Sequence, residues 1–437
     1  MTLNKDTHKV AYHTLGCKLN FAETSTIGKI LSERGFVRAV GNDIPDICVI
    51  NTCSVTEVAD KKGRQLIRRL CNKFPDATII VTGCYAQLKP EEIAKIPGVD
   101  IVLGSDEKLK IGDFLDEWLF KQEQHIAVMP AKEIREFHSS CEKGDRTRYF
   151  LKVQDGCDYF CTYCTIPLAR GRSRSGTIED MVRQAEQVAA EGGKEIVITG
   201  VNIGDFGKGR DDNFFDLIKA LDKVHGIERY RISSIEPNLL SKDIIKWVAH
   251  ESRTFMPHFH IPLQSGSDEV LKLMHRHYDT TLFRERIEMI RQEMPHAFIG
   301  VDIIAGARGE TEEEWQKSLE FVRSLDVTQL HVFPYSERPN TRALNIGHVV
   351  SQEEKHRRVH QLVSISEQKY AIFEQKALGS IRKVLWEQPQ RNAPMHGFTD
   401  NYLRVEAAYT PALVNNISNV ELLEIDGETI IGRIINE

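Results

Sequence analysis

The chain has 437 residues, of which 41% are hydrophobic and 27% are charged, and its formal net charge is −6. This composition is typical of a globular protein with about two to four domains. No run of about 18 apolar residues occurs, which excludes a transmembrane helix, and the polar start Met1–Lys9 lacks the apolar core of a signal peptide. We therefore expect a cytoplasmic protein with no membrane or DNA partner, in which any RNA binding comes from local basic patches.

The first 120 residues predict an open parallel α/β sheet, because strand-like runs alternate with helix-like runs across short connections. The expected strands are Lys9–Thr14, Ile47–Asn51, Thr78–Thr82 and Asp100–Leu103. The expected helices are Phe21–Arg34, Thr56–Phe74, Pro90–Ile96 and Glu107–Leu119.

One cysteine follows each of the first three expected strands: Cys17, Cys53 and Cys84. Ligands of open parallel sheets bind at the carboxyl ends of the strands, so three loops at this edge can bring three thiols together. The alternative is that the three are unrelated small apolar residues. We interpret the remaining N-terminal thiols, Cys48 and Cys71, and Cys141 further on, as buried or incidental.

The helix expected from Thr56 contains a strongly basic segment, Asp60–Lys73, with six basic residues and one acid. Such a helix face is either simply solvated or a contact surface for the phosphates of RNA. The sequence leaves both interpretations open.

Residues 121–148 are charged and are interpreted as a linker that carries a short strand, Ile126–Met129. Residues 149–375 then repeat a strand and a helix six times, which predicts parallel strands around a barrel core. Six units are too few for a closed eight-stranded barrel, so we expect a partial, open one. The expected strands are Phe150–Gln154, Glu195–Thr199, Arg229–Ile235, His258–Leu263, Phe298–Ile304 and Gln329–Pro334.

A compact cysteine loop follows the first barrel strand, with Cys157, Cys161 and Cys164 in the spacing C-x3-C-x2-C. Thiolates are soft ligands, and such a loop suits an iron–sulfur cluster. Three ligands for a cubane leave one iron open for chemistry, by the logic of catalytic zinc sites. A zinc knuckle or unrelated thiols are the alternatives, but no matched Cys or His pair follows Cys164 soon enough for zinc.

Polar residues and glycines end the next barrel strands, at the edge where barrel active sites lie. They are Gly200, Asn202, Ser233, Glu236, Gln264 and Asp302. Each could simply cap a turn, but as a set they favour a small-molecule site.

Residues 376–437 follow a charge-rich helical stretch, Ser351–Lys376, and predict a small antiparallel β-barrel. The expected strands are Ile381–Glu387, Tyr402–Ala408, Val420–Ile425 and Thr429–Ile435. Gly397–Tyr402 is expected to lie between two of them. Phe398 and Tyr402 could stack on a base, but packing in the barrel core is the preferred interpretation.

The cysteine spacing and the segments around it resemble the radical S-adenosylmethionine (SAM) methylthiotransferases. The cysteine loop continues into Thr165-Ile-Pro167 and Ala169–Ser175 as in that family, and Thr14–Cys17, Asn51–Cys53 and Thr82–Cys84 match its N-terminal segments. The resemblance covers essentially the whole chain. It implies an N-terminal domain at 1–120, a partial (β/α)6 radical SAM core at 149–375 and an RNA-binding TRAM-like barrel at 376–437.

The resemblance also implies the cofactors and the partners. A [4Fe-4S] cluster on Cys157, Cys161 and Cys164 would bind SAM and cleave it reductively, and an auxiliary [4Fe-4S] cluster on Cys17, Cys53 and Cys84 would deliver the sulfur. The strand-end residues, Gly200 to Asp302, would line the SAM and substrate cavity. The reaction would replace C–H by C–S–CH3 in the anticodon stem-loop of a tRNA, with electrons from a reductant protein such as flavodoxin or ferredoxin.

Within the family, Thr14–Asn20 and His331–Ser336 are most similar to the enzymes acting at C2 of N6-threonylcarbamoyladenosine, position 37 of tRNA. That nucleoside carries a carboxylate, so Lys18 and Arg342 are candidate substrate contacts. Arg342 stands where the family often has proline. The alternatives are methylthiolation of N6-isopentenyladenosine or of a ribosomal-protein aspartate, and, outside enzymes, a metal-stabilised RNA-binding protein that would hold zinc.

Overall fold

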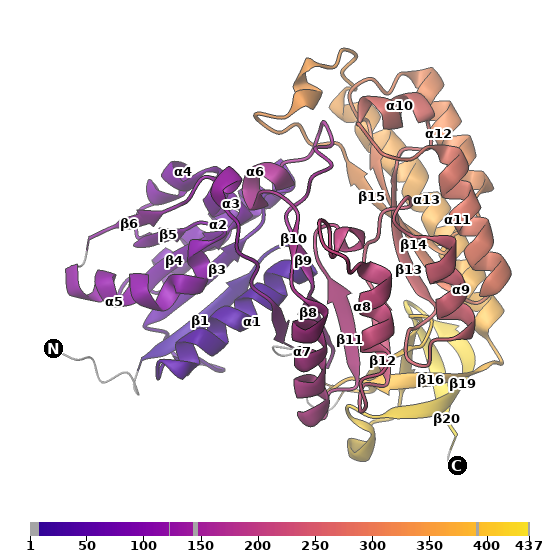
Figure 1. Ribbon diagram of the computed structural model, residues 1–437, viewed down its shortest axis with the longest axis horizontal. Coiled ribbons are helices and arrows are strands. Elements are labelled where there is room, and N and C mark those ends of the chain that lie inside the picture. Colours follow the sequence, from indigo (N-terminus) through magenta and orange to yellow (C-terminus); the bar gives the residue numbers. More distant parts are fainter. Residues whose placement is uncertain (1–7, 122, 143–146, 390–392, 436–437) are drawn as a thin grey trace.

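The computed structural model describes residues 8–121, 123–142, 147–389 and 393–435. An N-terminal sheet with its helices, a central open barrel and a small C-terminal barrel follow one another along the chain (Figure 1). The N-terminal sheet lies beside the open side of the central barrel, and the C-terminal barrel lies against the end of the central barrel where its strands begin.

The N-terminal sheet is an open parallel sheet, as predicted, with the strand order β2-β1-β3-β4-β5-β6. Its strands are β1 (Lys9–Thr14), β2 (Val37–Arg38), β3 (Ile47–Thr52), β4 (Thr78–Gly83), β5 (Ile101–Leu103) and β6 (His125–Ala127). Its helices are α1 (Lys18–Glu33), α2 (Glu57–Lys73), α3 (Cys84–Leu88), α4 (Pro90–Ala94) and α5 (Ile111–Lys121). The strand expected inside the linker is β6, which extends this sheet beyond β5.

The central strands of this sheet are buried along their whole length, since helices cover both faces. In the register, Asn51 lies between Thr14 of β1 and Thr82 of β4. The carboxyl ends of three neighbouring strands are therefore level with one another. Thr56 caps α2 by accepting a hydrogen bond from the Ala59 amide, which explains why that helix begins where the sequence predicts.

The central barrel contains the six predicted parallel strands. They are β8 (Tyr149–Lys152), β11 (Glu195–Thr199), β12 (Arg229–Ile232), β13 (His258–Gln264), β14 (Phe298–Ala305) and β15 (Gln329–Pro334). Strands β8, β11 and β12 pair in one sheet, which β7 (Ser140–Glu142) joins antiparallel, and β13 to β15 pair in another. Parallel bridges between Tyr230 and Phe255 and between Ser234 and His260 join the two sheets into one curved wall.

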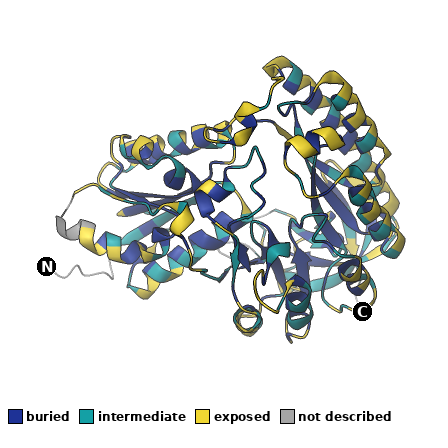
Figure 2. Ribbon diagram, turned by 45° about the horizontal axis from the view of Figure 1, so that its top comes forward, coloured by how far each residue is buried: buried dark blue, intermediate teal, exposed yellow. Residues whose placement is uncertain are grey.

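Helices cover the outer face of this wall. They are α7 (Ile178–Ala190), α8 (Phe214–Leu221), α9 (Lys242–His250), α11 (Thr280–Glu293), α12 (Glu312–Ser324) and α13 (Gln352–Ala377). The connections also contain the short helices α6 (Ile166–Arg170) and α10 (Asp268–Leu273) and the short strands β9 (Gln154–Asp155) and β10 (Arg174–Ser175). Figure 2 shows buried strands under helices whose outer surfaces are exposed.

Alternate residues of the barrel strands face the inside of the barrel. Val301 and Ile303 of β14 and Leu330 of β15 belong to the core under the helices, so their neighbours point inward. The inward residues include Asp302 and His331, which keep partial exposure, and Phe333, which is 46% exposed. The inner face therefore remains accessible near the carboxyl ends of the strands.

The C-terminal barrel is closed in the order β16-β17-β18-β20-β19, and all of its pairs are antiparallel except β18 with β20. Its strands are β16 (Ile381–Trp386), β17 (Met395–Thr399), β18 (Arg404–Ala407), β19 (Ile417–Asp426) and β20 (Thr429–Ile434). The expectation that Gly397–Tyr402 lies between strands is wrong for its first half, which belongs to β17. The sequence hides this strand because Gly397 and the polar residues around it read as a turn.

Phe398 and Tyr402 stack on each other with ring centroids 4.9 Å apart, but outside the core of their own barrel. Arg148 lies 4.5 Å above the Phe398 ring, and its guanidinium donates a 3.1 Å hydrogen bond to the Tyr402 hydroxyl. The Tyr402 ring also packs 4.7 Å from His258 of β13. The core-packing interpretation is wrong, because both rings cover the amino-terminal end of the central barrel instead.

A second buried contact joins the N-terminal sheet to the loop that follows β15. Arg338, 2% exposed, donates hydrogen bonds of 2.8 Å to Asp60 and 2.7 Å to Ser54 at the start of α2. Lys89 adds a 3.2 Å ion pair to the same carboxylate. The contact thus holds the start of α2 against the loop after β15, just beyond the end of β3.

We expect Arg338→Met to loosen this contact by about 3 kcal/mol, because the buried Asp60 carboxylate loses its main partner. Hydrogen exchange of the backbone amides at Ser54–Asp60 measures the local opening free energy. The exposed Arg342, four residues further on, is the matched control and should leave exchange unchanged on replacement by Met. Equal exchange in the Arg338 variant and the unmodified protein would contradict the role of the ion pair.

Candidate active site

The loop carrying Cys157, Cys161 and Cys164 begins directly after β9 at the carboxyl end of β8. Gly156 has a positive φ of 69°, and a side chain there would meet the Arg172 carbonyl oxygen at 2.0 Å, so this turn requires glycine. The Cys157 amide donates a 3.1 Å hydrogen bond to the Gly171 carbonyl. The loop is therefore closed on itself through the segment that follows it.

Hydrogen-bond donors point at all three sulfur atoms of this loop. The amide of Tyr159 lies 3.4 Å from Cys157 Sγ, and the amide of Ile166 lies 3.5 Å from Cys164 Sγ. The guanidinium of Arg276 donates to Cys161 Sγ at 3.1 Å. Donors of this kind stabilise the charge on cluster sulfurs and tune their potential, so the loop fits the iron–sulfur cluster expected from its spacing.

Arg276 also pairs with Glu236 at the end of the third strand. The pKa of Glu236 is raised because burial outweighs the attraction of that guanidinium. The carboxylate is thus held toward the cysteine loop by an internal partner. Arg276 was not predicted from the sequence; its neighbours His275 and His277 are equally polar, and no spacing rule distinguishes it.

Gln154 connects the cysteine loop to the turn after β11. Its side-chain oxygen accepts hydrogen bonds from the amides of Val201 and Asn202 at 3.0 and 2.8 Å, and its nitrogen donates to the Gly156 carbonyl at 2.7 Å. Gly200 faces the same side chain, and a Cβ on it would lie 3.1 Å from the Gln154 oxygen. Sequence reasoning missed Gln154, although a glutamine at the end of an apolar strand is a usable signal.

Asn202 is 2% exposed, and among the described residues neither polar atom of its side chain has a hydrogen-bond partner. A buried amide without partners is costly and indicates a site for a polar ligand. Ser233 is buried at the end of the third strand, and Gln264 takes a positive φ of 65° at an irregularity of β13. These residues share the carboxyl edge of the barrel, as predicted, and their roles toward SAM stay predictions.

Asp302 lies deeper, on the inner face of the barrel. Its carboxylate is 2.7 Å from Nε2 of His260, whose ring stacks on His331 at 4.9 Å. Asp302 is therefore engaged by His260 of the neighbouring strand. Its charge acts on Lys18 and also on Glu236, which pairs with Arg276 beside the cysteine loop.

The N-terminal thiols follow three neighbouring strands, as predicted, but only Cys53 lies in a loop. Cys17 is the N-cap residue of α1, and Cys84 is the first residue of α3, a helix that sequence reasoning missed. Gly16 approaches Cys53 so closely that a Cβ there would lie 3.0 Å from the sulfur. Thr52 of β3 pairs in register with Gly83 of β4. Cys53 and Cys84 each follow one residue later, so they begin from neighbouring positions at the ends of these two strands.

All nine cysteines are free thiols. Burial raises the pKa of Cys53 to about 12, with a smaller contribution from the neighbouring Cys84, and burial likewise raises the pKa of Cys157 to about 12. Such thiols stay protonated at neutral pH until a metal displaces the proton. In the part of the chain that the structure describes, no three His, Cys, Asp or Glu side chains lie close enough to hold a single metal ion.

Lys18 is half-buried at the first turn of α1, a helix with no acidic residue in that turn. Burial lowers its pKa; the charges of Arg148 and Arg231 lower it further, while Tyr402 and Asp302 act in the opposite direction. Lys18 thus faces the inside of the barrel from its open side. No ion pair of Lys18 is present among the described residues.

Arg342 is exposed on the loop after β15. The next residue, Ala343, donates a 2.9 Å amide hydrogen bond to the carbonyl of Thr162 in the cysteine loop. The structure therefore does not bring Arg342 into the group of charges around Lys18. Arg148 and Arg231 are the arginines found there.

The chain matches known sequences along most of its length. The family model described as uncharacterized protein family UPF0004 matches residues 9–104, and the model of the radical SAM superfamily matches residues 151–322. A relative from Bacillus subtilis, named threonylcarbamoyladenosine tRNA methylthiotransferase MtaB, is 40% identical over 95% of this chain and 94% of its own. The chain belongs to the radical SAM methylthiotransferases.

Other members of the family are similar at lower identity. A Thermotoga maritima protein with the same name is 37% identical over 91% of both chains. A Clostridium perfringens protein named tRNA-2-methylthio-N(6)-dimethylallyladenosine synthase is 30% identical over the full length of both. Membership in the family brings SAM and a [4Fe-4S] cluster as cofactors of this methylthiotransferase.

Solved structures show the same fold. The radical SAM methyltransferase TsrM from Kitasatospora setae, solved with cobalamin and a [4Fe-4S] cluster bound, has a TM-score of 0.57 at 12% identity. The alignment covers 77% of this chain and 74% of TsrM. No helix among the described residues of the methylthiotransferase is long and apolar enough to cross a membrane.

Proposed function

We propose that this methylthiotransferase adds a methylthio group to C2 of N6-threonylcarbamoyladenosine at position 37 of tRNA. The observation that carries the proposal is that two sets of three thiols lie on opposite sides of one buried interface. Arg170, six residues beyond Cys164, donates a 2.8 Å hydrogen bond to Asn20, whose side-chain oxygen lies 3.8 Å from Cys17 Sγ. One set serves SAM cleavage, and the other serves delivery of sulfur.

In this proposal Cys157, Cys161 and Cys164 hold the radical SAM cluster. Cys17, Cys53 and Cys84 hold an auxiliary [4Fe-4S] cluster. When bound, the reduced radical SAM cluster supplies the electron that cleaves SAM, so that a carbon radical can take hydrogen from the base. No side chain could do this by acid–base chemistry, because an aromatic C–H is far too weak an acid.

The chain's own residues bind and orient the reactants. Gln154 fixes the turn that carries Asn202 against the cysteine loop, and Asn202 offers its unpaired amide to SAM. Phe333 presents an exposed ring on the inner face of the barrel, suited to stacking on the target adenine. The base would then lie between the two clusters.

The choice of nucleoside rests on the charges around Lys18 together with the names of the more similar relatives. Threonylcarbamoyladenosine carries a carboxylate, whereas the isopentenyl group is apolar. A half-buried lysine without an internal ion pair, at an uncapped helix start and near Arg148, favours an anionic ligand. Arg148 and Arg231 pair with Glu387 and Glu195, so an apolar substituent would leave the Lys18 ammonium without an anionic partner.

We expect Lys18→Met to weaken binding of threonylcarbamoylated tRNA by about 2 kcal/mol, the contribution of a hydrogen bond to a charged group. Binding of the same tRNA without the threonylcarbamoyl group should stay unchanged. The affinities of both tRNAs for both proteins are the measurement. Arg342→Met is the control for an exposed cation and should affect the two tRNAs equally.

Equal losses for both tRNAs in the Lys18 variant would assign Lys18 to phosphate contacts. No loss at all would favour the isopentenyladenosine alternative. The basic face of α2 is a candidate for such phosphate contacts, because five of its six basic side chains are exposed. They are Lys61, Lys62, Arg68, Arg69 and Lys73. A reductant protein such as flavodoxin or ferredoxin remains part of the proposal.

A further inference from the structure

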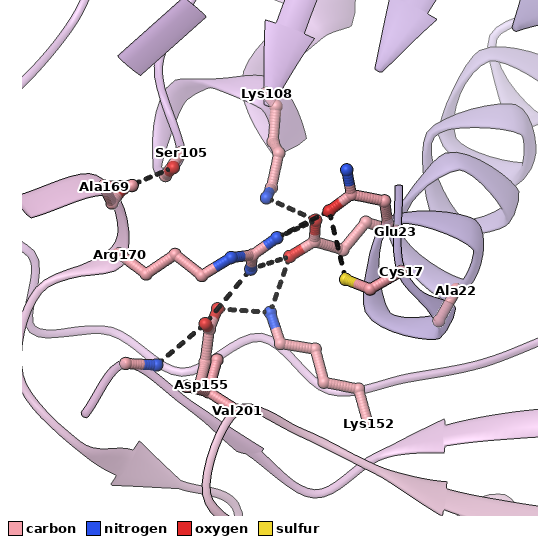
Figure 3. A network of polar contacts seen from close by, with 12 residues as sticks. Cys17, Ala22, Glu23, Ser105, Lys108, Lys152, Asp155, Ala169, Arg170 and Val201 are labelled. Carbon is pink, nitrogen blue, oxygen red and sulfur yellow. Dashed lines mark hydrogen bonds and ion pairs between the residues drawn. The ribbon is translucent and has the colours of Figure 1, made fainter. Parts of the chain in front are cut away.

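Five charged side chains form a buried network between the N-terminal sheet and the barrel (Figure 3). Glu23 of α1 forms ion pairs with three cations: its carboxylate lies 2.7 Å from the Lys108 nitrogen, 3.1 Å from that of Lys152 and 2.8 Å from the Arg170 guanidinium. Asp155 pairs with Lys152 at 2.7 Å and with Arg170 at 3.1 Å. All five side chains are at most 5% exposed.

This network connects the two cysteine sets. Asp155 lies two residues before Cys157, and Arg170 closes the short helix α6 that follows Cys164. On the other side, Arg170 reaches Cys17 through Asn20, and α6 packs against α3, whose first residue is Cys84. Figure 3 shows Arg170 and Lys108 converging on Glu23, with the Cys17 sulfur beside them.

The charges of the network do not balance. When ionised, Lys108, Lys152 and Arg170 carry three positive charges against the two negative charges of Glu23 and Asp155, and burial lowers the pKa of Lys108. Arg174, partly buried, adds a further cation 3.3 Å from Asp155. A buried charge is strongly unfavourable unless it is paired, so the network lacks an anion.

A buried arginine elsewhere in the chain shows the opposite balance. Arg358 of α13 is 2% exposed and contacts three carboxylates, those of Glu310, Glu312 and Glu354. A positive excess also occurs where Arg229 and Arg231 share the Glu195 carboxylate, but there both guanidiniums also donate to backbone carbonyls of the C-terminal barrel. Beside the thiols, a [4Fe-4S] core with three thiolates would bring one net negative charge.

We propose that Arg170 is a positioning residue for the auxiliary cluster, which supplies the anion that the buried network lacks. Loading of the cluster then stabilises the packing of the N-terminal sheet against the barrel. Burial alone would raise the pKa of Glu23, but its three cations outweigh burial and hold the pKa below its usual range, so Glu23 stays ionised. This inference rests on the proposed ligand role of Cys17, Cys53 and Cys84.

The test measures the reduction potential of the auxiliary cluster alone, by redox titration with electron paramagnetic resonance detection. The parent protein carries Cys157→Ala, Cys161→Ala and Cys164→Ala, so that only the N-terminal thiols can hold a cluster. Arg170→Met removes a positive charge, so it should disfavour the reduced cluster, which is the more negative of the two states. We expect the equilibrium constant for reduction to fall at least about tenfold, which lowers the one-electron potential by about 59 mV. Glu23→Gln should shift the potential in the opposite direction, because it removes a negative charge.

Opposite shifts separate an electrostatic role from a merely structural one, since loss of packing has no reason to depend on the sign of the charge. Arg170→Lys keeps the charge and should stay closer to the parent than Arg170→Met. Arg358→Met is the matched control for loss of a buried arginine and should leave the potential unchanged. Identical potentials in the parent, Arg170→Met and Glu23→Gln would overturn the inference.

A second measurement needs no redox change. Hydrogen exchange of α1 and α6 should slow in the parent protein when the auxiliary cluster is reconstituted, and Arg170→Met should abolish most of that difference. Equal exchange with and without the cluster would overturn the coupling to packing. A parent protein that binds no iron and sulfide would overturn the proposed auxiliary site itself. A parent protein that binds the cluster, with the same potential in the Arg170→Met and Glu23→Gln variants, would overturn only the role of Arg170.

Discussion

We expect the Cys161→Ala variant to form no 5′-deoxyadenosine from SAM above background. Cys161 is one of three thiols on a loop that is closed by the Cys157–Gly171 hydrogen bond, and its sulfur accepts a hydrogen bond from the guanidinium of Arg276. Without it, two thiolates remain for a cluster that already has one ligand fewer than the usual four. The expected effect is therefore complete loss rather than slowing.

The measurement is chromatographic detection of 5′-deoxyadenosine after anaerobic reconstitution and chemical reduction. Cys48→Ala is the control, because Cys48 is a fully buried thiol within β3 that belongs to neither set. That variant should cleave SAM like the unmodified protein. Cleavage of SAM by Cys161→Ala would show that the assignment of the barrel cluster is wrong.

The second large effect is expected from Cys53→Ala, which should cleave SAM but form no methylthio product. Cys53 follows β3 of the N-terminal sheet, whereas the hydrogen-bond donors to the three barrel sulfurs belong to the barrel itself, so removal of Cys53 leaves those hydrogen bonds in place. The sulfur-delivering cluster, in contrast, loses one of its three ligands. Product formation and SAM cleavage should therefore become uncoupled.

Both quantities are measured in the same reaction: 5′-deoxyadenosine and the methylthiolated nucleoside released from tRNA by digestion. Cys71→Ala, which removes a buried thiol from α2, serves as the control and should retain both activities. If Cys53→Ala lost SAM cleavage and product to the same extent, two separable clusters would be contradicted. If it kept both, the N-terminal thiols would have no role in the reaction.

Local patterns in the sequence predicted the strands that carry the site. Periods of apolar residues identified β1, β3 and β4, and the common position of Cys17, Cys53 and Cys84 after them predicted their convergence. The same patterns could not identify α3, which begins at Cys84 and has five residues, too few for a helical period. Nor could they identify β17, where Gly397 interrupts the alternation of a strand.

The remaining parts of the site depend on contacts between distant segments. Arg170 and Glu23 are 147 residues apart in the chain, and Arg148 and Tyr402 are 254 apart. Nothing local marks Arg170 among the arginines of Ala169–Ser175 as the buried one. The same holds for Lys18, which only the packing of α1 against the open side of the barrel places beside Arg148, Arg231 and Tyr402.

The most direct test of the account is the product formed by the reconstituted methylthiotransferase on two tRNAs. One carries N6-threonylcarbamoyladenosine at position 37, and the other carries N6-isopentenyladenosine. Mass spectrometry of the digested nucleosides should detect a 2-methylthio derivative of the threonylcarbamoyl nucleoside, and little or none of the isopentenyl one. A methylthio derivative only of isopentenyladenosine, or of neither nucleoside while SAM is cleaved, would contradict the proposed function.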